Sequence, residues 1–85
     1  MRIVCDENFD KKLKKLPDII QEFYQEQETI FRKNWRDPRL HTKKLTGHPL
    51  AFSFRITRQY RVLFSFIDSD TAFFTTIAHR RDVYR

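Results

Sequence analysis

The C-terminal segment IAHRRDVYR brings an imidazole, several guanidinium groups and a phenol together directly after an apolar run. His79, Arg80 and Tyr84 carry side chains that can exchange protons or stabilise negative charge on a phosphate. Arg61 interrupts another apolar run, YRVLFSFI, where a buried charge would be costly. We therefore expect the Arg61 guanidinium to reach solvent or a ligand, and we take these four residues as the candidate catalytic set.

Cleavage of RNA is the reaction that these side chains suit best. RNA carries its own nucleophile, the 2′-hydroxyl, so cleavage needs a base, an acid and cations that stabilise the phosphorane. His, Lys, Arg and Tyr side chains supply all three without a metal ion, and we expect no cofactor. The base and the acid stay open among Lys43, His79 and Tyr84. The further side chains expected to bind RNA are Lys43, Lys44, Arg55 and Arg58.

Composition argues against several other kinds of site. Gly47 is the only glycine, so the chain has no glycine-rich phosphate loop. A single cysteine, Cys5, and three scattered histidines do not make a zinc site. The carboxylates fall mostly in the expected helices, which gives a paired-carboxylate mechanism little support.

The candidate residues also have ordinary structural explanations. Arg61 could pair with a surface aspartate, His79 could bond to backbone at a strand end, and Tyr84 could pack against the helices. His41 and His48 are interpreted as loop residues without a catalytic role.

Charge is distributed unevenly along the 85 residues, whose net charge is +6. Residues 1–31 carry a net charge of −2 and residues 32–85 a net charge of +8. This basic half favours a polyanionic partner such as nucleic acid. No apolar stretch approaches the roughly 20 residues that span a bilayer, and MRIVCDENF does not resemble a signal peptide. We expect a cytoplasmic protein with no membrane partner.

The elements that must position these residues follow from hydrophobic spacing, and we expect one domain over residues 1–85. Residues 2–5 predict a short strand, and Phe9, Leu13 and Leu16 lie at helical spacing. Pro17 begins a second helix that continues to Phe31, and residues 36–49 are expected to be a loop. Three strand-like runs follow, at 52–57, 60–67 and 71–78. The sequence thus predicts an α+β fold, β-α-α-β-β-β, with two N-terminal helices packed on a mainly antiparallel four-stranded sheet.

One rim of this predicted sheet should collect the candidate residues. Consecutive antiparallel strands form a hairpin, so the start of the run 60–67 lies near the end of the run 71–78. Arg61 and His79 would then share one rim.

Four segments of the chain resemble the RelE/ParE superfamily of toxins from type II toxin–antitoxin modules. They are, in order, FDKKLKKLPDIIQEF, RLHTKKLTG, FSFRITRQYRVLFSF and IAHRRDVYR, and the resemblance extends over nearly the whole chain. The resemblance implies a RelE-like fold whose concave sheet surface holds the active site. It also implies a metal-independent endoribonuclease, an mRNA interferase that inhibits translation by cutting mRNA, for most members on the 70S ribosome.

The same resemblance implies partners and residue roles. The partners are a cognate antitoxin, mRNA with the ribosome, and operator DNA reached only through the antitoxin complex. Arg61 matches an arginine that holds the scissile phosphate, Arg80 one that stabilises the transition state, and Tyr84 a tyrosine that stacks on a base or assists proton transfer. His79 matches an acid–base position. Basic or histidine side chains of relatives correspond to Lys43, Lys44 and Arg55.

Two other functions are compatible with the resemblance. One is a ParE-like toxin that inhibits DNA gyrase and is no nuclease, since such chains often carry HRRD near the end. The other is a degenerate member that only binds its antitoxin or operator DNA. No glutamate lies between residues 40 and 67, so a variant with a glutamate base does not fit.

Overall fold

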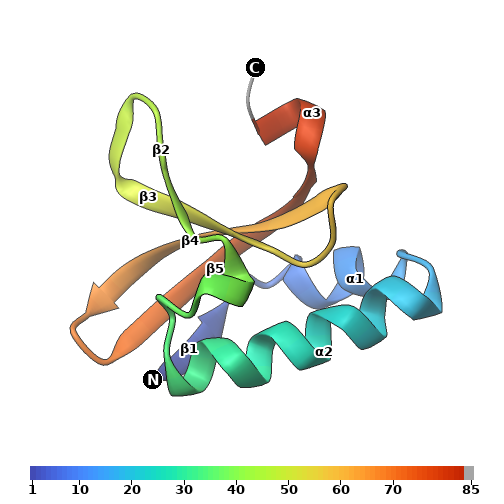
Figure 1. The fold of residues 1–85 in the computed structure, drawn as a ribbon, viewed down its shortest axis with the longest axis horizontal. Coiled ribbons are helices and arrows are strands. Elements are labelled where there is room, and N and C mark those ends of the chain that lie inside the picture. The colour runs from blue at the N-terminus through green and yellow to red at the C-terminus, as the bar shows by residue number, and fades with distance from the viewer. Residues whose placement is uncertain (84–85) are drawn as a thin grey trace.

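The computed structural model describes residues 1–83, which form a sheet with two helices along one face and a third on the other (Figure 1). The elements are β1 (Arg2–Cys5), α1 (Phe9–Lys14), α2 (Asp18–Lys33), the short 3-10 helix η1 (Pro38–Leu40), β2 (Lys43–Leu45), β3 (His48–Arg55), β4 (Tyr60–Asp68), β5 (Thr71–His79) and α3 (Arg80–Val83). Within residues 1–83, no helix is long and apolar enough to cross a membrane.

The sheet has five strands in the order β1-β5-β4-β3-β2, which corrects the predicted four-stranded sheet. It is mixed, because β1 runs parallel to β5 whereas the other pairs are antiparallel. The α+β class and the two N-terminal helices are confirmed, while α3 is an additional helix.

The extra strand β2 lies in the segment that was predicted to be a loop. Residues 46–47 close a tight hairpin in which Gly47 adopts a φ of +79°, a conformation that glycine reaches without steric cost. β3 consequently begins at His48, four residues earlier than predicted. Pro49 suggested a loop, but the ladder between β3 and β4 begins only at Phe52, so the missing N–H of Pro49 costs no hydrogen bond there.

Phenylalanine rings fill the space between the sheet and the helices. Phe31 of α2 is fully buried, and its ring centroid lies 5.0–5.1 Å from those of Phe54, Phe64 and Phe74. Burying one such side chain stabilises a fold by roughly 1.5–3 kcal/mol. Because successive strand residues point to opposite faces, Phe54 on the helix side directs its neighbour Arg55 to the other side. The core therefore fixes which face carries the basic residues.

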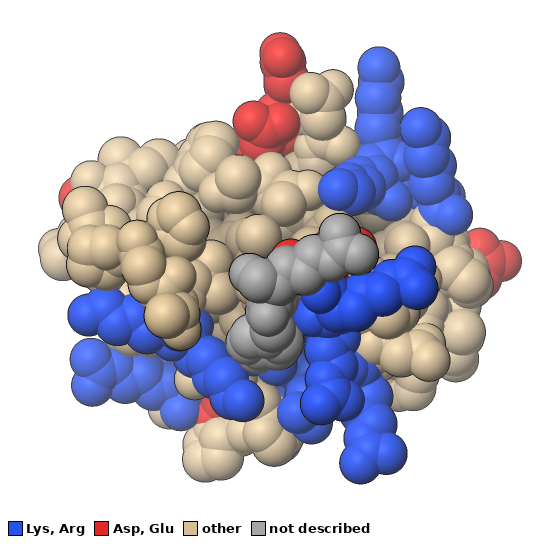
Figure 2. Space-filling model, turned by 90° about the horizontal axis from the view of Figure 1, so that it is seen from above, with Lys and Arg blue, Asp and Glu red and all other residues tan. Residues whose placement is uncertain are grey.

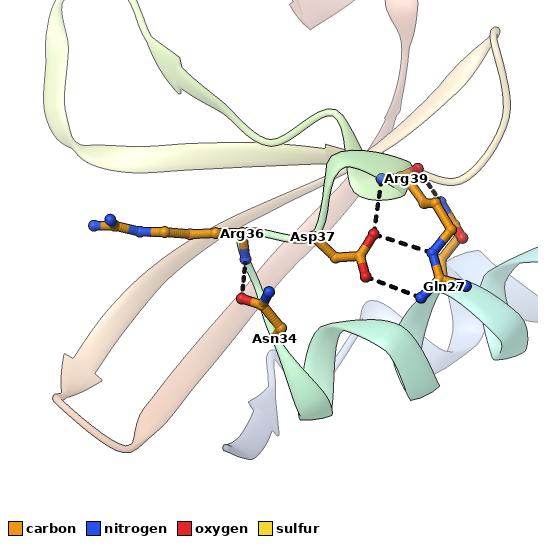
Figure 3. A network of polar contacts seen from close by, with 5 residues as sticks. All are labelled: Gln27, Asn34, Arg36, Asp37 and Arg39. Carbon is orange, nitrogen blue, oxygen red and sulfur yellow. Dashed lines mark hydrogen bonds and ion pairs between the residues drawn. The ribbon is translucent and has the colours of Figure 1, made fainter.

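Gln27 joins α2 to the sheet. Its side-chain amide donates to the carbonyl of Arg39 at 3.0 Å and to the carbonyl of Arg55, the last residue of β3, at 2.8 Å. The contact with Arg39 lies at the edge of a polar network around η1 (Figure 3). One helical side chain thus holds both the end of β3 and the segment that precedes β2.

Replacing Gln27 by methionine, which has a similar length, should lower the free energy of unfolding by about 1–3 kcal/mol because both carbonyls lose a donor. Gln25→Met is the matched control, since Gln25 is exposed on the same helix, and it should change stability by less than about 0.5 kcal/mol. Urea denaturation of both variants measures the difference. Equal stabilities would show that the two bonds contribute nothing.

Candidate active site

A pocket of 190 Å³ is lined by five cationic side chains and by no carboxylate among the described residues. We call it the cationic pocket, and its residues are Lys43 of β2, Arg55 of β3, Arg58 of the following turn, Arg61 of β4 and Arg80 of α3. These cations come from three adjacent strands, the β3–β4 turn and α3, and the pocket lies on the side of the sheet away from α1 and α2. Figure 2 looks onto this side and shows Lys and Arg side chains over the lower half of the view and also at its upper right.

The strand register explains why the cations converge. Arg55 lies directly opposite Arg61 in the β3–β4 ladder, and Lys43 lies opposite Ser53 in the β2–β3 ladder. Residues that face each other in this way share one face of the sheet. Like charges directly opposite one another destabilise a sheet. An anion bound between them would remove that repulsion, so the arrangement suits a phosphate.

Arg61 is only 2% exposed, so of the two expected destinations of its guanidinium, solvent or a ligand, it does not reach solvent. Its Nε donates to the Ser53 hydroxyl at 2.8 Å, and its Nη2 donates to the carbonyl of Ser53 at 3.3 Å and to the carbonyl of His41. These bonds meet the cost of burying the guanidinium. These three acceptors are uncharged, so the bonds to them fix the position of the guanidinium and bring no negative charge of their own.

Ser53 and the backbone of His41 are parts of this site that sequence reasoning missed. Ser53 is fully buried although it lies on the face away from the helices, since Arg61 covers it. The available signal was a small polar residue between two phenylalanines on a strand beside an arginine-bearing strand. His41 adopts a left-handed conformation with φ of 47°, which is uncommon outside glycine. No local pattern in the sequence indicated that its carbonyl would bind Arg61.

His79 lies at the predicted rim but not in the cationic pocket. In the β4–β5 ladder, Tyr60 pairs with His79 and Arg61 with Ala78, so the His79 and Arg61 positions face opposite sides of the sheet. The His79 ring packs edge-on against Tyr60, with centroids 5.5 Å apart. Its Nδ1 accepts the backbone N–H of Arg81 at 3.3 Å, which is the strand-end bond to backbone considered above.

Arg80 connects His79 to the cationic pocket. Besides that pocket, Arg80 lines a 420 Å³ pocket with Arg58 and His79, and a 580 Å³ pocket with Lys43 and His79. Its side chain is exposed, and its backbone N–H donates to the carbonyl of Gln59 at 2.6 Å. The first residue of α3 is therefore fixed to the β3–β4 turn while its guanidinium remains accessible.

The other predicted site residues lie apart. Lys44 follows Lys43 on β2 and lines a different pocket, beside Trp35. His48 lies with Lys44 along a 520 Å³ groove that also includes residues of α3. Tyr84 lies outside the described residues, so its role stays a prediction. Within residues 1–83, no group of three or more His, Cys, Asp or Glu side chains is placed to hold a metal ion.

Known structures with the same architecture come from toxin–antitoxin systems. RelE in the RelB-RelE antitoxin-toxin complex from Methanococcus jannaschii shares 23% sequence identity, covers 95% of this chain and 94% of its own, and gives a TM-score of 0.75. The YoeB/ParE toxin from Agrobacterium tumefaciens shares 13% identity with coverages of 94% and 99% and a TM-score of 0.77. YafQ from E. coli shares 10% identity over the whole of both chains with a TM-score of 0.75. The chain has the RelE-like toxin fold.

Sequence comparison adds nothing to this, since no protein-family model and no curated protein matches the chain. At identities of 10–23% the likeness establishes the RelE-like fold, and function must be argued from the site. In this RelE-like fold, the cationic pocket lies on the side of the sheet that α1 and α2 leave uncovered.

Proposed function

We propose that this chain is the toxin of a type II toxin–antitoxin module and a metal-independent endoribonuclease that cleaves mRNA at the cationic pocket. The observation that carries the proposal is the set of five cations around 190 Å³, one of which, Arg61, is buried and held in position by hydrogen bonds. Such a pocket matches the spread negative charge of a phosphorane. The RelE-like fold supports the toxin assignment.

In the proposed reaction, the 2′-oxygen of one nucleotide forms a bond to the adjacent phosphorus while the bond from phosphorus to the 5′-oxygen breaks. A base takes the proton of the 2′-hydroxyl, and an acid gives a proton to the departing 5′-oxygen. The products are a 2′,3′-cyclic phosphate and a 5′-hydroxyl end. Arg61 binds the phosphate from a fixed position, and the exposed Arg80 completes the charge around it.

His79 can donate a hydrogen bond to the reacting phosphate in this scheme. Because Nδ1 accepts the Arg81 N–H, the neutral ring carries its proton on Nε2 and presents a donor there. His79 reaches the phosphate region through the pockets that it shares with Arg80. The base and the acid stay open among Lys43, His79 and Tyr84.

The partners belong to the same proposal. RelE from Methanococcus jannaschii and from Pyrococcus horikoshii was solved in complex with RelB, which supports a cognate antitoxin for this chain. Translating ribosomes in the cytoplasm would present the mRNA, and operator DNA would be reached through the antitoxin complex.

The direct test incubates purified protein with translating ribosomes and maps the 5′ ends of the mRNA. We expect new 5′-hydroxyl ends within the coding sequence. A DNA gyrase supercoiling assay runs in parallel, and inhibited supercoiling with intact mRNA would instead favour the ParE-like alternative. Intact mRNA at a stoichiometric amount of protein would overturn the nuclease proposal.

RNA binding at the cationic pocket should depend steeply on salt. Each phosphate neutralised on a single strand contributes about −0.7 to the slope of log K against log salt concentration, so five cations set a limit of about −3.5. Arg55→Ala should make the slope shallower by about 0.7, whereas Lys33→Ala, an exposed cation on α2, should leave it unchanged. Fluorescence anisotropy with a 2′-O-methyl RNA, which lacks the nucleophile, measures both. An identical slope for the two variants would place the RNA elsewhere.

A further inference from the structure

A second pocket, of 350 Å³, lies on the other side of β2, and nothing in the proposed reaction uses it. We call it the Trp35 pocket, and its walls include Trp35, Arg36, His41, Thr42, Lys44 and Phe52. It thus combines aromatic rings with cationic side chains, and the Asp37 carboxylate that also lines it is bound by Arg39. That combination is typical of surfaces that bind single-stranded nucleic acid, where bases stack on rings and cations follow the backbone.

The Trp35 ring is held firmly. It packs edge-on against Phe52 and Phe66, with centroids 5.7 Å and 4.9 Å away, and remains partly exposed. The Thr42 hydroxyl donates to the carbonyl of Trp35 at 2.8 Å, which ties the two ends of this segment together. A ring fixed in this way loses little conformational freedom when a ligand stacks on it.

Arg36 lies over this ring, with its Cζ 4.8 Å from the ring centroid. Figure 3 shows the Arg36 side chain extending away from Asp37, whose carboxylate is bound instead by the backbone N–H and guanidinium of Arg39. The hydrogen bond from the Arg39 guanidinium lowers the pKa of Asp37 to about 2. No carboxylate in residues 1–83 forms an ion pair with Arg36. Its planar cation is therefore available to pair with a base or a phosphate.

The Trp35 pocket and the cationic pocket are neighbours across the edge of the sheet. β2 is the edge strand, and its consecutive residues Lys43 and Lys44, whose Cα atoms lie about 3.8 Å apart, line the cationic and Trp35 pockets respectively. His41 makes a second link, since it lines the Trp35 pocket while its carbonyl accepts a hydrogen bond from Arg61. A nucleotide strand that crosses β2 would contact both pockets.

We propose that the Trp35 pocket is a nucleobase subsite, which receives a base of the same RNA strand whose phosphate lies in the cationic pocket. The base stacks against Trp35 or Arg36, and Lys44 binds the backbone between the two pockets. This inference rests on the proposed function, because it requires RNA at the cationic pocket.

Trp35 is the only tryptophan of the chain, so tryptophan fluorescence excited at a wavelength that tyrosine does not absorb reports on this pocket alone. A 2′-O-methyl trinucleotide should quench the Trp35 emission as it binds. Pyrophosphate, which carries no base, should displace the trinucleotide without quenching. If the trinucleotide binds in competition with pyrophosphate and the emission stays unchanged, the subsite is refuted while the proposed function stands. If neither ligand binds, the proposed function fails, and the subsite with it.

Substitutions separate stacking from simple attraction. Arg36→Ala and Lys44→Ala should each weaken trinucleotide binding by about tenfold and leave pyrophosphate binding unchanged, whereas the control Lys33→Ala should change neither. Trp35→Phe should retain most of the affinity, and Trp35→Leu should lose about tenfold. Thermal melts identify any variant that fails to fold, and Arg36→Ala keeps the test valid because Arg36 is exposed. Equal affinities for Arg36→Ala and Lys33→Ala would overturn the subsite.

Discussion

Replacing Arg61 by alanine is expected to lower the free energy of unfolding by about 3–5 kcal/mol, because three hydrogen-bond acceptors lose their donor. The Arg61 guanidinium is almost completely buried and serves the hydroxyl and carbonyl of Ser53 and the carbonyl of His41. Without it, these acceptors lose their donor, and each such loss costs about 1–3 kcal/mol. The segment before β2, which holds Lys43, would lose its tie to β4.

Urea denaturation monitored by circular dichroism measures this loss. Arg55→Ala is the matched control, since Arg55 lies directly opposite Arg61 and removes the same charge from a partly exposed position. We expect it to change stability by no more than about 0.5 kcal/mol. If Arg61→Ala proves as stable as Arg55→Ala, the hydrogen bonds of Arg61 contribute nothing to the fold.

Lysine at position 61 tests the geometry of the same site. Arg61→Lys keeps the charge but replaces a planar fork by a compact ammonium on a flexible stem. It cannot reach all three acceptors in the positions that the guanidinium serves, so we expect it to recover only part of the lost stability. Loss of toxicity in Arg61→Ala would therefore report on folding as well as on catalysis, and only the comparison with lysine separates the two.

Arg80→Ala is expected to reduce the rate of RNA cleavage by about 10²–10³ while stability stays unchanged. This magnitude is typical of removing one preorganised donor from the charge that develops in a transition state. Arg80 lines the cationic pocket, but its side chain is exposed and only its backbone N–H is bound to Gln59. Alanine therefore removes the charge without leaving a buried acceptor unpaired.

The adjacent arginine provides the control for this variant. Arg81 is exposed on the same short helix and lines the 580 Å³ pocket beside His79, but not the cationic pocket. Single-turnover cleavage of ribosome-bound mRNA should show less than about a fivefold effect for Arg81→Ala, because it lacks the transition-state contact. Equal losses for the two variants would mean that α3 acts through its overall charge. A lower melting temperature for Arg80→Ala would assign it a structural role instead.

Together, Arg61 and Arg80 illustrate two ways of supplying charge to one pocket. Arg61 is buried and positioned by the fold, whereas Arg80 is carried on the surface at the end of β5. The first couples the site to stability, and the second does not. Mutational data on this chain need a stability measurement beside every activity measurement for that reason.

The sequence by itself determined the features that depend on local periodicity. Alternation from Phe52 to Ile56 assigned the core face of β3 and placed Arg55 on the opposite face. Spacing of three and four residues defined α1 and α2, and the short turn after residue 67 defined the hairpin of β4 and β5. These patterns follow from the 3.6-residue and two-residue repeats of the backbone, which each segment carries without reference to the rest of the chain.

The tertiary structure decided what depends on distant partners. β1 pairs in parallel with β5, nearly 70 residues away, and β2 became a strand only because β3 lies beside it. The burial of Arg61 depends on Ser53 and on the backbone of His41, which no local pattern joins to it. The register of the β4–β5 ladder placed His79 and Arg61 on opposite faces of the sheet at the rim they share. A shift of one residue in that register would move a side chain to the other face. The types of the side chains determine which chemistry is available. The pairing of strands that are distant in the sequence determines which of these side chains lie close enough together to act on one phosphate.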